Sequence, residues 1–229
     1  LIAFSSVAAT YKATHRNGLE VAIKIIHRSH GAYAPVVERF LEEAHLANRV
    51  GHPGVERIFD DGTTDDGSVF LVMELLLGET LELRRVAKGG RLSQRSALPI
   101  FDGLLDALAA VHAAGVVHQN LKPGNVFLTN DGRVVLTDFG RARLLSANAE
   151  RAPSIEGRAT GTPADMPPEQ ARGRRSEIDA RSDVWAAGAI MFTTLTGRRV
   201  HEAKTPAERL ELAATRPAPR LGAVTSIVD

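Results

Sequence analysis

The amino-acid sequence predicts an α+β fold in two lobes, a small β-rich N-terminal lobe and a larger, mainly helical C-terminal lobe. Apolar runs typical of strands precede Gly78, a connector follows at that glycine, and most apolar residues beyond it keep a helical period. The chain has 229 residues, of which 44% are hydrophobic, enough for the core of one large domain or two small lobes.

The first elements are a strand and a helix. Residues 19–26 alternate in side-chain character and carry Lys24 on one face, which predicts a strand with one lysine turned into a site. Residues 35–50 have apolar side chains at helical spacing, with Pro35 near the start and Gly51 just after the end. A helix is therefore expected to follow the strand.

A further strand leads to the lobe boundary. Residues 68–78 are rich in apolar side chains and end at Gly78, as a buried strand that runs into a connector would. We expect the N-terminal lobe to cover residues 1–76, with a mainly antiparallel sheet, and the C-terminal lobe to cover residues 77–229.

The C-terminal part begins with a long helix and a hairpin. Residues 93–114 keep a helical period, although Pro99 lies inside and is expected to kink the helix or delay its start. Residues 125–140 contain two short apolar strands around an Asn-Asp-Gly turn at 130–132, which is a strong hairpin signal.

A loop and a buried helix follow. Residues 146–175 are rich in Ser, Pro, Gly, Arg and Glu and lack a period, which predicts a long functional loop. Residues 182–196 return to an apolar helix, which we expect Ser182 to cap. The longest mostly apolar stretch, at 184–195, is shorter than the roughly 20 residues that a membrane-spanning helix needs.

The composition excludes several classes of function. The 28 basic and 27 acidic residues nearly cancel, so no overall field favours nucleic acid or a membrane surface. The absence of cysteine excludes disulfides, cysteine-zinc sites and thiol nucleophiles, and it fits the cytoplasm, which is the location we expect. Because the sequence starts at Leu1 rather than Met, we expect a segment of a longer protein.

Six short motifs follow one another along the chain: VAIK at 21–24, Glu43, VHQNLKPGN at 117–125, DFG at 138–140, PPE at 167–169 and SDVWAAG at 182–188. In this order they resemble the motifs of protein kinases, and those of bacterial serine/threonine kinases in particular. The Lys-Pro pair of the third motif and Gly161-Thr162 are similar to the serine/threonine branch. The resemblance implies one protein kinase domain, incomplete at the start of its N-terminal lobe and without the family's last helices.

The resemblance implies that Lys24 binds ATP. A lysine between Ile23 and Ile25 in the middle of a strand would be costly without a counter-charge. In the family this lysine bridges the α- and β-phosphates of ATP and a glutamate on the next helix. We prefer Glu43 as that glutamate, with Glu42 as the alternative.

The resemblance also implies an adenine pocket and a magnesium site. The adenine residues would be Met73 at the back, the backbone of Glu74 and Leu76 at the adenine edge, and Ala22 and Phe127 on the two faces of the ring. Core packing remains an alternative role for Met73, Leu76 and Phe127. Asn125 and Asp138 flank the hairpin, so the turn folds them together, and their amide and carboxylate oxygens suit Mg²⁺ bound with phosphates.

Three further motif residues have structural roles by resemblance. Asp183 would hold the backbone of the catalytic loop, and His118 would join the stack through Phe139 that connects the lobes. An acid–base role is the alternative for His118. Glu169 would lack the arginine with which it normally pairs.

The catalytic loop departs from the family at Asn120, which stands where the family has its catalytic aspartate. Aspartate accepts the proton of the substrate hydroxyl, whereas a neutral amide has no comparable basicity. General-base help is worth roughly 10²- to 10⁴-fold, so we expect a large deficit in catalysis. The deficit need not be total, because positioning and metal electrostatics dominate phosphoryl transfer and Lys122 can still steady the phosphoryl group.

Two other regions depart from the family. Gln119 replaces the arginine that usually binds a phosphate on the activation loop, so control by phosphorylation through that contact is not expected at Ser146, Ser154 or Thr160. Ala3, Ser5 and Ala8 occupy the glycine positions of the phosphate-binding loop. Their Cβ atoms should hinder the approach of backbone N–H groups to phosphates and weaken nucleotide binding.

These observations leave three functional hypotheses. The first is a pseudokinase, a signalling or scaffolding domain that still binds ATP and Mg²⁺ but transfers phosphate weakly or not at all. The second is an active but slow serine/threonine kinase that works without a carboxylate base. The third is an interaction domain that binds no nucleotide. In each case we expect a protein partner or substrate, no nucleic acid, and no membrane contact from this segment.

Overall fold

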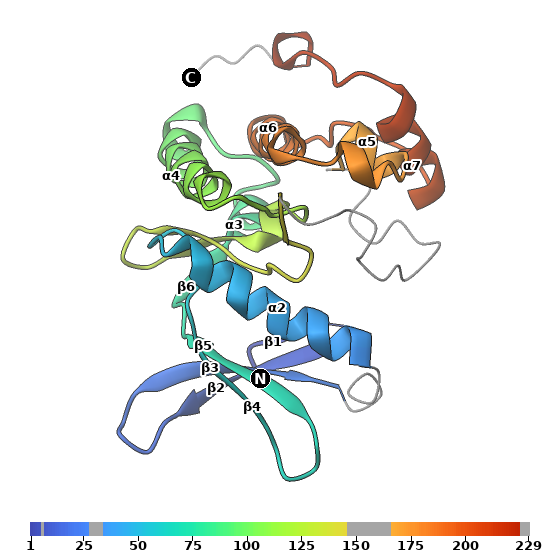
Figure 1. The fold of residues 1–229 in the computed structure, drawn as a ribbon. Helices are drawn as coiled ribbons and strands as arrows, with labels where there is room; N and C mark the ends of the chain where they lie inside the picture. Colours follow the sequence, from blue (N-terminus) through green and yellow to red (C-terminus); the bar gives the residue numbers. More distant parts are fainter. Residues whose placement is uncertain (6, 28–33, 146–165, 225–229) are drawn as a thin grey trace.

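The computed structural model describes residues 1–5, 7–27, 34–145 and 166–224 and confirms the two-lobed α+β fold. Figure 1 shows a sheet with helix α2 at one end of the molecule and the remaining helices at the other. The N-terminal sheet has the strand order β1 (Ala3–Phe4), β2 (Ala8–Thr14), β3 (Glu20–Ile26), β5 (Val69–Glu74) and β4 (Ile58–Thr63). All neighbours in this sheet are antiparallel, as the sequence predicts.

Helix α2 (Ala34–Val50) confirms the helix predicted at residues 35–50. It packs against β4 and β5 through a buried face that includes Phe40 and Leu46. Gly51 ends the helix with a φ of +62°, a left-handed conformation that glycine adopts without steric cost. The pattern of apolar residues and the terminal glycine were therefore sufficient to locate this helix.

The hairpin predicted within residues 125–140 is also present. Strands β8 (Val126–Thr129) and β9 (Val134–Leu136) pair in antiparallel fashion, with Val126 opposite Leu136. Gly132 has a φ of +90° in the turn between them, where an L side chain would be strained. The hairpin brings its two ends, and the residues that flank them, close together.

The strand predicted at residues 68–78 is shorter than expected. Strand β5 ends at Glu74, and Gly78 begins a separate strand, β6 (Gly78–Thr80), which pairs with β8. Gly78 has a φ of +151°, and a Cβ at this position would lie 2.1 Å from the carbonyl oxygen of Leu128. The glycine therefore marks a close approach of two backbones, and not the end of a strand.

The C-terminal lobe is built from helices joined by short strands and turns. These elements are α3 (Leu81–Ala87), α4 (Gln94–Ala113), β7 (Val116–Val117), the 3-10 turn η1 (Pro123–Asn125), β10 (Arg143–Leu144), α5 (Pro168–Ala171), η4 (Arg175–Glu177), α6 (Ala180–Thr196), α7 (Pro206–Thr215) and η5 (Leu221–Ala223). Strand β7 pairs with β10 in antiparallel fashion.

Pro99 does not delay the start of α4. The helix begins at Gln94, because the Ser93 hydroxyl accepts a hydrogen bond from the backbone N–H of Ser96 at 3.3 Å and so caps its first turn. By length and composition α4 alone among the described helices could cross a membrane. In the fold, however, its buried side chains, among them Leu104 and Val111, pack against β9 and α6.

Helix α6 begins earlier than the sequence indicates, and Ser182 is not its capping residue. The N-cap is Asp179, whose carboxylate accepts a hydrogen bond from the N–H of Arg181 at 2.8 Å. Ser182 completes the cap from the third position of the helix, because its hydroxyl accepts from the N–H of Asp179 at 3.3 Å. Gly197, with a φ of +72°, ends the helix.

The predicted loop at 146–175 is described only from residue 166 onward, where it contains the short helix α5 and the turn η4. Ser146, Ser154, Thr160 and the Gly161-Thr162 pair lie outside the described residues.

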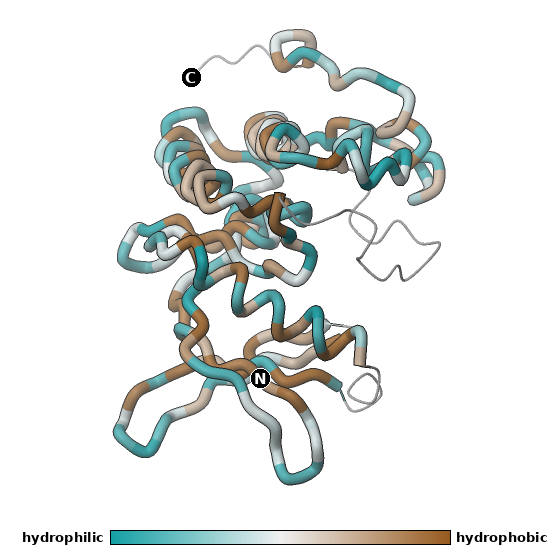
Figure 2. The backbone as a smooth tube through the Cα atoms, in the orientation of Figure 1, coloured by the Kyte–Doolittle hydropathy of each residue, from teal (hydrophilic) through white to brown (hydrophobic). Residues whose placement is uncertain are grey.

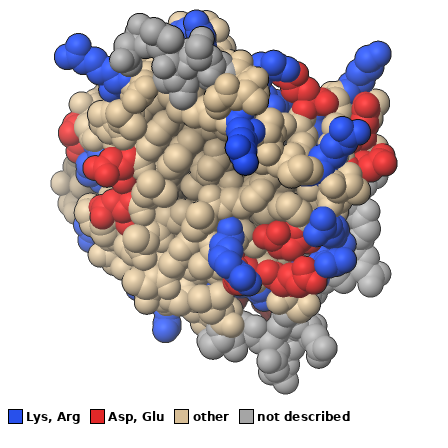
Figure 3. Space-filling view, turned by 90° about the horizontal axis from the view of Figure 1, so that it is seen from above, with Lys and Arg blue, Asp and Glu red and all other residues tan. Residues whose placement is uncertain are grey.

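One apolar core runs through both lobes. It includes Leu71 and Met73 of the sheet, Leu104 of α4 and Ile190 of α6. Figure 2 shows hydrophilic residues at the turns of the N-terminal sheet and more hydrophobic residues along its strands. Figure 3 shows side chains of both charge signs on the end formed by the C-terminal lobe, without a large field of one sign.

Candidate active site

The ion pair expected on the basis of the family motifs joins β3 to α2. The Lys24 ammonium lies 2.6 Å from Oε1 of Glu43, while the alternative partner Glu42 is exposed. The Glu43 side chain is 3% exposed and that of Lys24 is 19% exposed, so water screens the pair poorly. Burial by itself lowers the pKa of Lys24, but the carboxylates of Glu43, Glu56 and Asp138 together raise that pKa above its ordinary value. Lys24 is therefore held as a cation.

The two residues expected to hold a metal meet at the carboxylate of Asp138. Nδ2 of Asn125 donates to Oδ2 of Asp138 at 3.2 Å, and Nδ2 of Asn120 donates to the same oxygen at 2.8 Å. Asn125 also donates to the backbone carbonyl of Asn120 at 2.8 Å. Asp138 itself has a φ of +66°, which is uncommon for a residue other than glycine. The three side chains form one connected polar group.

This group fits a magnesium ion that is bound together with phosphates. Asp138 supplies a carboxylate and Asn125 an amide, and both are oxygen donors of the kind that Mg²⁺ prefers. No group of three metal-binding His, Cys, Asp or Glu side chains occurs among the described residues. Among the described residues, Asp138 and Asn125 are therefore the candidate oxygen donors, and the remaining ligands would be phosphate oxygens and water.

A buried acid that the sequence analysis missed also contacts Asp138. Oε1 of Glu56 accepts a hydrogen bond from the backbone N–H of Asp138 at 2.6 Å, and Glu56 is only 5% exposed. Burial and the neighbouring charge of Glu43 raise the pKa of Glu56 to about 8, although Lys24 opposes this rise. The available signal was a lone acid in the otherwise apolar or basic run from Val55 to Phe59.

The catalytic-loop backbone is held by the start of α6. Oδ2 of Asp183 accepts from the N–H of His118 at 2.8 Å, and Oδ1 accepts from the N–H of Gln119 at 2.9 Å. Asp183 is 1% exposed, and His112 adds a third contact at 3.0 Å. Gln119 has a φ of +61°, so these bonds fix an unusual turn directly before Asn120. The contacts match the role that the resemblance implies for Asp183.

His118 lies in a stack with the residue after Asp138. Its ring centroid is 4.6 Å from that of Phe139, and its Nε2 lies 3.2 Å from the carbonyl oxygen of Thr137. Burial lowers the pKa of His118, although the charges of Asp183 and Asp138 oppose this shift. His118 is fully buried, which favours the structural role over acid–base chemistry.

The residues expected around adenine lie on β3, on β5 and the segment directly after it, and on β8. Ala22 and Met73 are buried and lie opposite each other in the register of β3 and β5, whereas Phe127 and Leu76 are half-buried. The N–H of Glu74 donates to the carbonyl of Arg57 at 2.9 Å. The backbone group of Glu74 that could contact an adenine edge would therefore be its carbonyl.

In the loop expected to bind phosphate, the Ser5 side chain bonds to the backbone of the loop itself. The Ser5 hydroxyl accepts from the N–H of Ala8 at 3.0 Å and contacts the carbonyl of Ala8 at 3.0 Å. Ala8 is buried, and Ala3 pairs with Thr10 across the hairpin. The Ser5 hydroxyl also accepts from the N–H of Val7 at 3.3 Å, so two N–H groups that could approach a phosphate are already occupied. Lys122 lies half-buried at the start of η1, three residues before Asn125.

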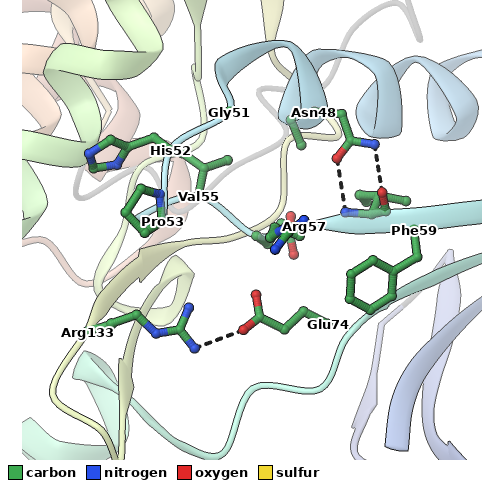
Figure 4. Close-up of a pocket in the computed structure, with 12 residues that line it drawn as sticks. Asn48, Gly51, His52, Pro53, Val55, Arg57, Phe59, Glu74 and Arg133 are labelled. Carbon is green, nitrogen blue, oxygen red and sulfur yellow. Dashed lines mark hydrogen bonds and ion pairs between the residues drawn. The ribbon is translucent and has the colours of Figure 1, made fainter. Parts of the chain in front are cut away.

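A cavity of about 530 Å³ lies between the end of α2, β4 and Arg133. Figure 4 shows the ion pair of Glu74 and Arg133 across it, and that ion pair is 2.8 Å long. Neither Lys24 nor Asp138 lines this cavity, but Glu56, which bonds to the backbone of Asp138, does.

Comparison with known proteins identifies the family. The protein kinase domain family matches residues 3–220. The chain is 40% identical over 192 residues to serine/threonine-protein kinase pkn2 of Myxococcus xanthus, covering 82% of this chain and 22% of that protein. It is 35% identical over 207 residues to serine/threonine-protein kinase PknA of Mycobacterium tuberculosis, covering 87% of this chain and 46% of that protein.

A third relative is serine/threonine-protein kinase Pkn1 of Myxococcus xanthus, 36% identical over 218 residues, with 93% of this chain and 30% of that protein covered. The chain thus spans less than half the length of these curated relatives. The match over nearly the whole chain, the Lys24–Glu43 ion pair and the contacts of Asp183 agree with one another. The chain belongs to the protein kinase domain family, and its relatives are bacterial serine/threonine kinases.

Proposed function

We propose that this serine/threonine protein-kinase-like domain binds ATP together with Mg²⁺, transfers phosphate weakly or not at all, and acts in signalling through a protein partner. The observation that carries the proposal is the pair of amides at Asp138. Asn120 and Asn125 both donate to its carboxylate, at 2.8 Å and 3.2 Å. A neutral amide thus occupies the position of the base, while the residues for phosphate and metal remain assembled around it.

The binding half of the proposal depends on Lys24, Asn125 and Asp138. Lys24 is a half-buried cation that can contact phosphate oxygens while it stays paired with Glu43. Asp138 and Asn125 would hold Mg²⁺, which neutralises phosphate charge when bound. The side-chain NH₂ group of Asn120 and the ion compete for the same oxygen of Asp138, so this hydrogen bond weakens metal binding.

The catalytic half depends on Asn120. Facing Asp138, its amide nitrogen is a donor and cannot take the proton of a substrate hydroxyl. The occupied N–H of Ala8 adds a second impairment, because the loop over the phosphates offers fewer donors. Lys122 remains as a cation for the transferring group, so a slow reaction by positioning alone is the second candidate function.

The first prediction is that ATP affinity depends on Mg²⁺. Because the backbone cradle for phosphate is impaired, the ion carries more of the charge neutralisation, and we expect a chelator to lower affinity about tenfold or more. Asp138→Ala should lower affinity to the same extent. The exposed carboxylate of Asp65, in the turn between β4 and β5, provides the control Asp65→Ala, which should bind like the wild type.

The measurement is a calorimetric titration of ATP into the three proteins, with Mg²⁺ and with chelator. Affinity that is unchanged by chelator or by Asp138→Ala would contradict the proposed metal site. No binding under any condition would favour the third hypothesis, an interaction domain that takes no nucleotide.

A further inference from the structure

Glu56 is a buried acid without a role in the function proposed above. It lies between α2 and β4, and its neighbours Val55 and Ile58 are 2% and 6% exposed. An acidic side chain in such surroundings costs stability unless a specific partner offsets the loss of water. Glu56 has such a partner in the backbone of Asp138.

The contact is short and acts on a strained residue. Oε1 of Glu56 lies 2.6 Å from the backbone nitrogen of Asp138, whose φ is +66°. A side chain other than glycine in this region of φ persists only where its surroundings hold it. The amides of Asn120 and Asn125 hold the carboxylate of Asp138, whereas Glu56 holds the main chain behind it.

The segment that carries Glu56 is itself fixed to β9. The N–H of Glu56 donates to the carbonyl of Leu136 at 3.0 Å, and the N–H of Leu136 donates to the carbonyl of Gly54 at 2.8 Å. Val55 and Leu136 form an isolated parallel bridge. These bonds fix the segment of Glu56 to β9, and Asp138 follows Leu136 by two residues. The carboxyl group of Glu56 and the backbone N–H that it contacts are therefore held in place together.

Glu56 also lines the cavity drawn in Figure 4, together with Asn48, Arg57 and Glu74. Gln and Leu are close to Glu in length, so substitution by these residues changes the end group with little change in volume.

We propose that Glu56 is a positioning residue, whose carboxyl oxygen fixes the backbone of Asp138 so that its side chain is presented to a metal ion beside Asn125. The metal part rests on the proposed function. The hydrogen bond to the backbone N–H does not.

The test compares Glu56→Gln, which keeps an acceptor oxygen, with Glu56→Leu, which removes it at similar size. The exposed Glu42→Gln serves as the matched control. The first readout is exchange of the Asp138 amide proton, followed by NMR. We expect exchange about tenfold faster or more in Glu56→Leu, and near wild-type rates in Glu56→Gln and the control.

The second readout is the affinity for Mg²⁺ in the presence of ATP, together with the thermal midpoint. Loss of a group that orients a ligand typically costs 10- to 100-fold in metal affinity, so we expect at least a tenfold loss in Glu56→Leu and rescue in Glu56→Gln. The thermal midpoint of Glu56→Leu should fall, because the N–H of Asp138 loses its acceptor, and Glu56→Gln should recover it. A residue that merely supports the fold would lower the thermal midpoint but leave the affinity of the folded protein for Mg²⁺ unchanged.

The two readouts separate failure of this proposal from failure of the proposed function. If the wild type binds no Mg²⁺ with ATP, the proposed function is wrong, and amide exchange still decides the role of Glu56. Unchanged exchange in Glu56→Leu, or full metal affinity in that variant, would overturn the positioning role.

Discussion

Asn120 differs from an aspartate by one NH₂ group in place of an oxygen, and the structure gives that group a partner. Its nitrogen donates to Asp138 at 2.8 Å. An aspartate in the same position would set two carboxylate oxygens against each other, an arrangement that a bound cation relieves. The atom at this position therefore determines whether the loop has a proton acceptor. It also determines whether the carboxylate of Asp138 needs a cation beside it.

The prediction at this scale is that Asn120→Asp increases phosphotransfer. It restores a proton acceptor at nearly constant volume, which is worth roughly 10²-fold at the low end of general-base catalysis. Activity should stay below that of an ordinary kinase, because the Ser5 hydroxyl still occupies the N–H of Ala8. Without Mg²⁺ the variant should unfold at a lower temperature than the wild type.

The assay is phosphate incorporation into a generic serine/threonine substrate. The background control is Asn120→Asp combined with Lys24→Met, which removes the phosphate contact. Robust and equal activity of the wild type and Asn120→Asp would show that Asn120 does not impair phosphotransfer and would favour the active-kinase hypothesis.

Sequence motifs predicted side-chain contacts where both partners belong to the same motif set. Glu43 beside Lys24 and Asp138 beside Asn125 belong to this group. Glu56 was missed because its partner is a backbone N–H 82 residues away, and a main-chain partner leaves no mark in a side-chain pattern. Its acidic character alone resembles an ordinary exposed glutamate.

Among the elements, the N-terminus of α6 combines two functions within one turn. Asp179 and Ser182 cap the helix, and the Ser182 hydroxyl donates to the carboxylate of Glu169 from the PPE motif. Asp183, the next residue, holds the catalytic loop. Among the described residues, Glu169 thus has a serine of the helix cap as a partner.

We predict that Asp183→Ala destabilises the fold far more than Asp179→Ala. Loss of Asp183 leaves the buried N–H groups of His118 and Gln119 without an acceptor, at about 1–3 kcal/mol each. Loss of Asp179 removes one helix cap, at about 1 kcal/mol. Urea unfolding of both variants measures the difference, and equal losses would mean that Asp183 acts only as a helix residue.

Element boundaries were predicted less well than the elements themselves, for local reasons. The strand before Gly78 was predicted too long because the glycine was taken as a stop signal, whereas it permits contact with the carbonyl of Leu128. Helix α6 was predicted too short because Ser182 resembles an N-cap as much as Asp179 does. Both errors concern contacts that a single segment does not reveal.

For the whole molecule, the two-lobed order was predictable because strand-like and helical patterns are segregated along the chain. What joins the lobes was not, since the bridge between Val55 and Leu136 and the bond from Glu56 to Asp138 depend on the folded arrangement.

We predict that His118 makes the fold less stable as pH falls below about 6.5. The raised pKa of Glu56, about 8, acts in the opposite direction over this range, because the folded protein then takes up the proton first. His118 is fully buried, and burial lowers its pKa in the folded state. The unfolded chain takes up a proton near its ordinary pKa of about 6.5, while the folded protein does not, so acid favours unfolding.

The check is the free energy of unfolding at pH 7.5 and pH 5.5, for the wild type and His118→Gln. On acidification the change in stability of the wild type should be less favourable than that of the variant, by up to about 1 kcal/mol per pH unit. Some pH dependence should remain in the variant, because burial also lowers the pKa of His201. An identical slope in both proteins would refute this assignment.

The attachment of α2 at one end has a mechanical consequence. Arg49 bonds to the carbonyl of Ala114 at 3.2 Å, and the segment after Gly51 is bonded to Leu136 of β9, so the end of the helix moves with the C-terminal lobe. Helix α2 can then tilt as a rigid body about a point near Gly51. Glu43 lies eight residues along it, about 12 Å away at 1.5 Å per residue. A tilt of about 10° displaces its carboxylate by roughly 2 Å, enough to break the 2.6 Å contact with Lys24 while β9 stays still.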